Sequence, residues 1–138
     1  MNTKTLLSGL VGGVAAFFLG WIIYGIILMP IMVEHGNTSI MRPEAEMIWW
    51  ALILGNLFYG LTISLIWSWS GINDFMSGLT KGALFGLIVT ISWDLMLYST
   101  STWYKDITGV VYDILASVVM TAIIGGVVGW MMGRGKNA

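Results

Sequence analysis

Four long apolar stretches, separated by short polar breaks, dominate the sequence. They cover residues 6–33, 47–69, 79–99 and 108–132. Each reaches or exceeds the roughly 20 residues that an α-helix needs to cross a hydrocarbon core of about 30 Å. The pattern therefore predicts an all-α membrane protein, a compact bundle of four transmembrane helices that forms a single domain over residues 1–138.

The first apolar stretch is longer than one membrane crossing requires, so we expect it to tilt or to extend past the lipid. Pro30 lies near its end and predicts a kink there, because proline cannot continue the backbone hydrogen bonds of a helix. Lys4 precedes the stretch, as a basic residue does in a signal peptide. The stretch is far longer than the roughly 7–15 apolar residues of a signal sequence, so we expect it to be retained as a helix.

Composition supports a lipid environment. Hydrophobic residues make up 57% of the chain and charged residues only 9%, whereas soluble domains carry roughly a quarter charged residues. The net charge of −1 argues against nucleic acid as a partner. The absence of cysteine excludes disulfides, thiolate metal sites and cysteine nucleophiles. We expect the lipid bilayer as the main partner, and no cofactor.

Basic residues predict the orientation of the helices. The side of the chain that holds both termini carries Lys4, Lys81, Arg134 and Lys136, and the opposite side carries Arg42 and Lys105. Because cytoplasmic loops carry the excess of Lys and Arg, this count predicts that both termini are cytoplasmic.

The eight tryptophans divide into two predicted groups. Tryptophan is enriched where a helix meets the membrane–water interface. Six are expected at the two interfaces, namely Trp49, Trp50, Trp67, Trp69, Trp103 and Trp130. Trp21 and Trp93 fall between these levels, and we expect them to be buried packing residues.

Small residues recur at four-residue spacing in the third and fourth helices. The glycines of these stripes are Gly78, Gly82, Gly86, Gly125, Gly129 and Gly133. Such stripes let the backbones of membrane helices approach closely. The sequence leaves open whether they pack within one chain or between the subunits of a homo-oligomer or a larger membrane complex.

Polar residues predict a pocket in the outer half of the bundle. Every helix places a polar side chain at a comparable level, and the predicted lining consists of Asp94, Asp113, Asn56, Tyr24, Ser117 and Thr90. A carboxylate within the bilayer costs at least about 2.5–3.5 kcal/mol, so it usually faces the bundle or water. No Lys or Arg lies deep in a helix to pair with either acid, so the two favour a shared proton or a bound cation.

A purely structural role for these acids remains the alternative. Asp94 could hold the helices together by hydrogen bonds to Ser117, Asn56 or a tyrosine. Asp113 lies within two turns of a helix N-terminus, where the helix dipole favours a carboxylate.

Other candidate sites are weaker. Met29, Met32 and His35 recur every three residues, and thioethers with an imidazole suit Cu(I), although methionine at a helix end usually serves packing. Glu34, His35, Glu44 and Glu46 resemble a solvated acidic loop more than a divalent-cation site. The single histidine is predicted in a loop, so no Ser-His-Asp arrangement is credible, and we do not expect an enzyme.

Several short stretches rich in glycine and aromatic residues recur through the helices. They are residues 19–25 (LGWIIYG), residues 55–60 (GNLFYG), Ser77-Gly78-Leu79 with Gly82, and Val111-Tyr112-Asp113. Together they resemble the small four-helix bacterial membrane proteins of unknown function. This resemblance spans most of the chain and implies a location in the bacterial inner membrane. It carries over no activity and no catalytic or binding residues.

Two functions follow as expectations. The first is a membrane-embedded binding or assembly module with a polar pocket in the outer half of the bundle. The alternative is a small proton- or cation-coupled transporter or channel that acts as an oligomer through Asp94 and Asp113.

Overall fold

The computed structural model describes residues 1–135 and is helical, with no strand in that range. Four helices are long enough and apolar enough to cross a membrane: Thr3–Ile27, Trp49–Ser70, Phe75–Thr100 and Ile107–Gly133. The prediction of four long apolar helices is thus confirmed. Lys136, which entered the prediction of orientation, lies outside the described residues.

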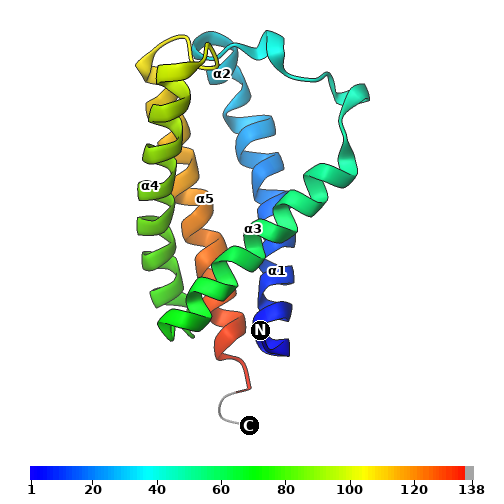
Figure 1. Ribbon diagram of the computed structural model, residues 1–138, viewed down its shortest axis with the longest axis vertical. Helices are drawn as coiled ribbons and strands as arrows, with labels where there is room; N and C mark the ends of the chain where they lie inside the picture. Colours follow the sequence, from blue (N-terminus) through cyan, green and yellow to red (C-terminus); the bar gives the residue numbers. More distant parts are fainter. Residues whose placement is uncertain (136–138) are drawn as a thin grey trace.

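The elements follow one another as an up-and-down bundle (Figure 1). Helix α1 (Thr3–Gly20) continues into the π-helix η1 (Trp21–Ile27) and the short α2 (Met29–His35). Two short 3₁₀ helices follow, η2 (Thr38–Ile40) and η3 (Glu44–Glu46), and then come α3 (Trp49–Ser70), α4 (Phe75–Thr100) and α5 (Ile107–Gly133). The strongest packing joins α4 to α5 and α1 to α3, and α1 also packs against α5.

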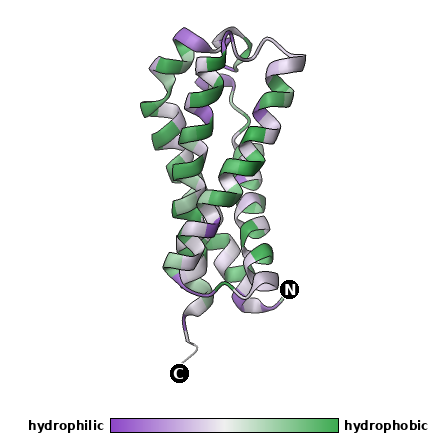
Figure 2. Cartoon of the chain, turned by 90° about the vertical axis from the view of Figure 1, so that its left-hand side faces the viewer, coloured by the Kyte–Doolittle hydropathy of each residue, from purple (hydrophilic) through white to green (hydrophobic). Residues whose placement is uncertain are grey.

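The start of α1 and the end of α5 lie at the same end of the bundle (Figure 1). The Lys4 ammonium donates a hydrogen bond to the backbone carbonyl of Arg134, which ties the start of α1 to the end of α5. Hydrophobic residues cover much of the length of the helices, and hydrophilic residues gather mainly towards the two ends (Figure 2).

Three helices begin at residues with a short polar side chain. The side chains of Asn2, Asp74 and Asp106 accept hydrogen bonds from the backbone N–H groups of Thr5, Ser77 and Gly109. Each bond satisfies one of the free donors in the first turn of a helix, which explains why α1, α4 and α5 start where they do. Helix α3 ends at Gly71, whose φ of 70° is the left-handed conformation that glycine adopts readily.

The first helix changes geometry before Pro30. The Leu28 N–H donates to the Ile23 carbonyl at 2.7 Å, a bond that spans five residues instead of four. Proline has no N–H to donate, and its ring clashes with the carbonyl four residues earlier. The kink predicted at Pro30 therefore takes the form of a π-helix that begins at Trp21, and π-helical turns are frequent at functional sites.

The glycine stripes of α4 and α5 face each other within one chain. A Cβ atom built on Gly78 would collide with the Gly125 carbonyl, and a Cβ on Gly125 would collide with the Gly78 carbonyl. A Cβ on Gly82 or Gly86 would likewise crowd Thr121. Gly129 and Gly133 lie against the backbone carbonyls of residues 74 and 73 at the start of α4. These six glycines are therefore used inside the chain, and an oligomer would need a different surface.

The indole of Trp67 fills the space that these glycines leave open. Trp67 is only 2% exposed, and its ring nitrogen donates to the Gly125 carbonyl at 2.9 Å. Trp67 therefore packs inside the bundle and does not face the lipid, and its predicted level at a membrane interface stays a prediction. Trp21 and Trp93, predicted to be buried, are 61% and 64% exposed. Level along a helix is readable from sequence, but which side of the helix faces inward depends on where the glycines let a partner approach.

Replacing Trp67 by phenylalanine is expected to lower the free energy of unfolding by about 1–2 kcal/mol. The substitution removes the hydrogen bond to Gly125 and shrinks a side chain that packs between α3, α4 and α5. Thermal unfolding of the protein in detergent measures the effect. Trp69→Phe is the matched control, because Trp69 is 77% exposed and should change stability little. Equal stability of the two variants would contradict a core role for Trp67.

Candidate functional site

Two carboxyl groups meet between α4 and α5, towards the end of the bundle that lies opposite the start of α1. Asp94 of α4 is 2% exposed, and its carboxyl interacts directly with that of Asp113 on α5. The Oδ2 atom of Asp94 is buried and has no hydrogen-bond partner. Among residues 1–135, neither acid forms an ion pair. A pair of facing carboxyl groups without a counter-charge favours a proton or another cation between them.

The glycine stripes explain why the two acids meet. Gly86 lies against Ser117 and Thr121 on the facing helix. Two helical turns beyond Gly86 the α4 stripe reaches Asp94, and one turn beyond Ser117 the antiparallel α5 stripe reaches Asp113. The close packing of small residues thus sets the register that brings the acids together.

Two tyrosines complete the cluster from other segments. The Tyr24 hydroxyl, carried by the π-helix, lies 2.5 Å from the Ser117 Oγ and also faces Asp113. Tyr104, from the connection between α4 and α5, is 5% exposed and directs its hydroxyl towards Asp94 and Asp113. Burial, followed by the negative charges of Asp113 and Asp94, raises the pKa of the Tyr104 hydroxyl. Tyr104 therefore stays protonated and can donate a hydrogen bond to either acid.

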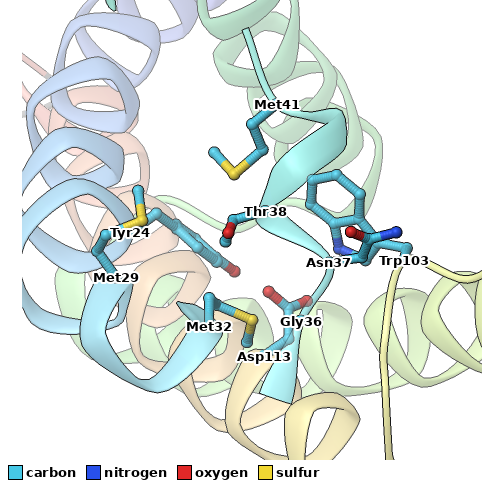
Figure 3. Close-up of a pocket in the computed structure, with 9 residues that line it drawn as sticks. All are labelled: Tyr24, Met29, Met32, Gly36, Asn37, Thr38, Met41, Trp103 and Asp113. Carbon is cyan, nitrogen blue, oxygen red and sulfur yellow. The ribbon is translucent and has the colours of Figure 1, made fainter. Parts of the chain in front are cut away.

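A cavity of about 80 Å³ opens beside this cluster. Its walls come from η1, α2, the segment after α2, the α4–α5 connection and α5 (Figure 3). They are formed by Tyr24, Met29, Met32, Gly36, Asn37, Thr38, Met41, Trp103 and Asp113. Asp113 is the one charged residue among them, and Figure 3 shows its carboxyl beside the Tyr24 hydroxyl.

Backbone hydrogen bonds join two of the segments that line the cavity. The Asn37 N–H donates to the Trp103 carbonyl at 2.7 Å, and the Lys105 N–H donates to the His35 carbonyl at 2.8 Å. The segment after α2 is thereby tied to the α4–α5 connection. These bonds hold the methionines of one segment and Trp103 of the other around the same space.

The structure brings together only part of the predicted pocket. Tyr24, Asp94, Asp113 and Ser117 form one cluster, as described above. The Asn56 amide instead donates to the Leu52 carbonyl on its own helix at 2.8 Å. Thr90 is half-buried one turn before Asp94 and lies outside the lining of the cavity.

The predicted soft-metal residues are also divided. Met29 and Met32 line the cavity, but His35 does not. The His35 Nδ1 donates to the Asp106 Oδ2 at 2.9 Å, and its ring stacks on Tyr112. This hydrogen bond lowers the pKa of Asp106. Among residues 1–135, no three acidic or histidine side chains are placed to hold a metal ion, the acidic loop with Glu34, Glu44 and Glu46 included.

Six residues of the site were not predicted from the sequence: Gly36, Asn37, Thr38, Met41, Trp103 and Tyr104. Trp103 was interpreted as an interfacial anchor, and Tyr104 and Met41 carry no spacing signal because they lie in connections between helices. One indication was available. Trp103 and Tyr104 form an aromatic pair in a break of only a few residues between two helices that each carry an acid near that break.

No family model, no curated protein and no solved structure matches the chain. The resemblance to small four-helix bacterial membrane proteins and the location in a bacterial inner membrane therefore remain predictions. The chemistry of the site itself has to carry any functional conclusion.

Proposed function

We propose that this chain is a bundle of four transmembrane helices that binds a cation at the Asp94–Asp113 pair. Both termini are cytoplasmic in this proposal, as the distribution of Lys and Arg predicts. The site then lies in the outer half of the bilayer. The protein is then the membrane-embedded binding module with an outer polar pocket that the sequence predicts, and its ligand carries a positive charge.

One observation carries this proposal: the buried carboxyl group of Asp94 lies next to a second acid, and one of its oxygens has no hydrogen-bond partner. Buried polar groups in proteins are almost always paired, and an unpaired one calls for an explanation. A cation supplies both the missing partner and the missing charge. The adjoining cavity supplies room for it and borders Asp113 directly.

The structural alternative explains less of the geometry. It requires Asp94 to bond to Ser117, Asn56 or a tyrosine. The Ser117 hydroxyl is bound to Tyr24, and the Asn56 amide is bound to its own backbone. Only Tyr104 remains, and its hydroxyl is shared between two acids.

Calorimetric titration of the protein in detergent with Na⁺, K⁺, ammonium and tetramethylammonium ions, together with proton uptake on changing pH, tests the proposal. We expect saturable binding of at least one cation that is lost in Asp113→Asn. The matched control is Glu44→Gln, which removes an exposed acid of the loop and should leave binding unchanged. Binding that survives in Asp113→Asn, or is absent in the wild type, would contradict the proposal.

Transport is the second candidate function. The close packing of the glycine stripes fills the half of the α4–α5 pair that lies nearer the start of α1. A carrier would have to separate these helices to pass a cation onward, so simple binding needs fewer assumptions. Cation flux into liposomes, compared between wild type and Asp94→Asn, distinguishes the two functions.

A further inference from the structure

The walls of the cavity restrict the kind of cation it can hold. Five of its nine lining residues are aromatic or carry a thioether: Tyr24, Met29, Met32, Met41 and Trp103. Only Asp113 offers a charge. Moving an inorganic ion from water into such walls costs its hydration free energy and returns few oxygen ligands.

The size of the cavity leads to the same conclusion. One water molecule needs about 10–15 Å³ of such a cavity. The volume of about 80 Å³ therefore holds a ligand of several heavy atoms, and a bare metal ion would leave most of it empty.

The placement of the sulfur atoms argues against a soft metal. Cu(I) or Ag(I) would need the thioethers to converge on one point. Met29 and Met32 come from α2 and Met41 from the segment after it, and the three sulfur atoms do not converge on one point in Figure 3. Thioether side chains in this arrangement form an adaptable apolar lining.

We infer that the cavity binds a small organic cation of the methylated ammonium class, with its charge towards Asp113 and its methyl groups against the aromatic and thioether walls. The inference rests on the proposed cation site and names the chemical class of its ligand. Aromatic faces attract quaternary ammonium groups, which are weakly hydrated and lose little on entering an apolar space. Asp113 supplies the counter-charge in the wall of the cavity, and its carboxyl lies beside the Tyr24 hydroxyl (Figure 3).

Equilibrium dialysis of the purified protein in detergent with radiolabelled tetramethylammonium tests this inference. We expect saturable binding at one site per chain, loss of that binding in Asp113→Asn, and binding about tenfold weaker in Trp103→Leu. Trp93→Leu is the matched control, because Trp93 is 64% exposed on the outside of the bundle and should bind as the wild type does. Trp103→Leu keeps the acid pair, so it tests the walls even if Asp113→Asn folds poorly.

The other outcomes separate this inference from the proposed function. Binding of protons, Na⁺, K⁺ or ammonium without binding of tetramethylammonium would overturn the organic-cation inference and leave the proposed function standing. Binding of Ag⁺ that is lost when Met29, Met32 and Met41 are changed to leucine, without tetramethylammonium binding, would replace it by a soft-metal site. No cation binding at all would overturn both.

Discussion

Changing Gly78 or Gly125 to alanine is expected to destabilise the fold by at least about 2 kcal/mol. The new Cβ atom would overlap with a carbonyl oxygen on the facing helix, so the backbones of α4 and α5 would have to separate. Because these are backbone contacts, no side chain can rotate away to relieve them. Unfolding in mixed detergent micelles, followed by circular dichroism, measures the loss of stability.

Gly55→Ala is the matched control for these variants. Gly55 lies within α3, and a Cβ atom there meets nothing within 4 Å. The same chemical change should therefore leave stability equal or slightly increase it, because alanine favours a helix more than glycine does. If Gly78→Ala were as stable as Gly55→Ala, the intrachain packing of the glycine stripes would be wrong.

A substitution that separates α4 from α5 should also move Asp94 away from Asp113. The register of Gly86 against Ser117 and Thr121 places Asp94 opposite Asp113. A destabilised glycine variant that still folds should therefore bind the cation more weakly, although the substituted residue touches no part of the cavity. Stability and binding are linked here through one helix–helix interface.

Periodicity predicted the parts of the fold that depend on spacing along a single helix. The four long apolar helices and the close approach signalled by the glycines at 78, 82, 125 and 129 are readable in this way. The side of a helix that turns inward is not, because hydrophobic residues point to the outside as well as to the inside of the bundle. Trp21 and Trp93 were misplaced for this reason, and the burial of Trp67 was not predicted.

The residues of the candidate site that lie on the long helices were predicted from the sequence, whereas those in the connections were not. The sequence placed the acids and Tyr24 at one level, and the structure brings them together. Asn56 lies at a similar level on α3, but its side-chain amide donates a hydrogen bond to the backbone of α3 itself. Met41, Trp103 and Tyr104 come from connections, and their positions depend on contacts between loops, such as the bond from the Asn37 N–H to the Trp103 carbonyl. No periodic pattern encodes such contacts.

Asp94→Asn is expected to make the protein more stable while it abolishes cation binding. The buried Oδ2 of Asp94 has no partner, and an unsatisfied buried group costs about 1–3 kcal/mol. Asparagine has the same shape and offers an amide donor to the facing carboxyl of Asp113. The substitution therefore supplies a hydrogen bond that needs no bound proton or cation, and stability should rise by about the same 1–3 kcal/mol.

Stability and cation binding of Asp94→Asn together distinguish a binding role of Asp94 from a purely structural one. If Asp94 held the helices together, its replacement by asparagine would lower the unfolding free energy, because a carboxylate makes stronger hydrogen bonds than an amide does. If Asp94 is retained for binding, stability rises and cation binding disappears, as in other sites that keep an unfavourable group for function. Asp74→Asn is a useful comparison, since Asp74 is an exposed helix cap whose replacement should affect neither cation binding nor the core. A fall in stability with cation binding unchanged would assign Asp94 to the fold alone, because the register between α4 and α5 would then be the only property that depends on it.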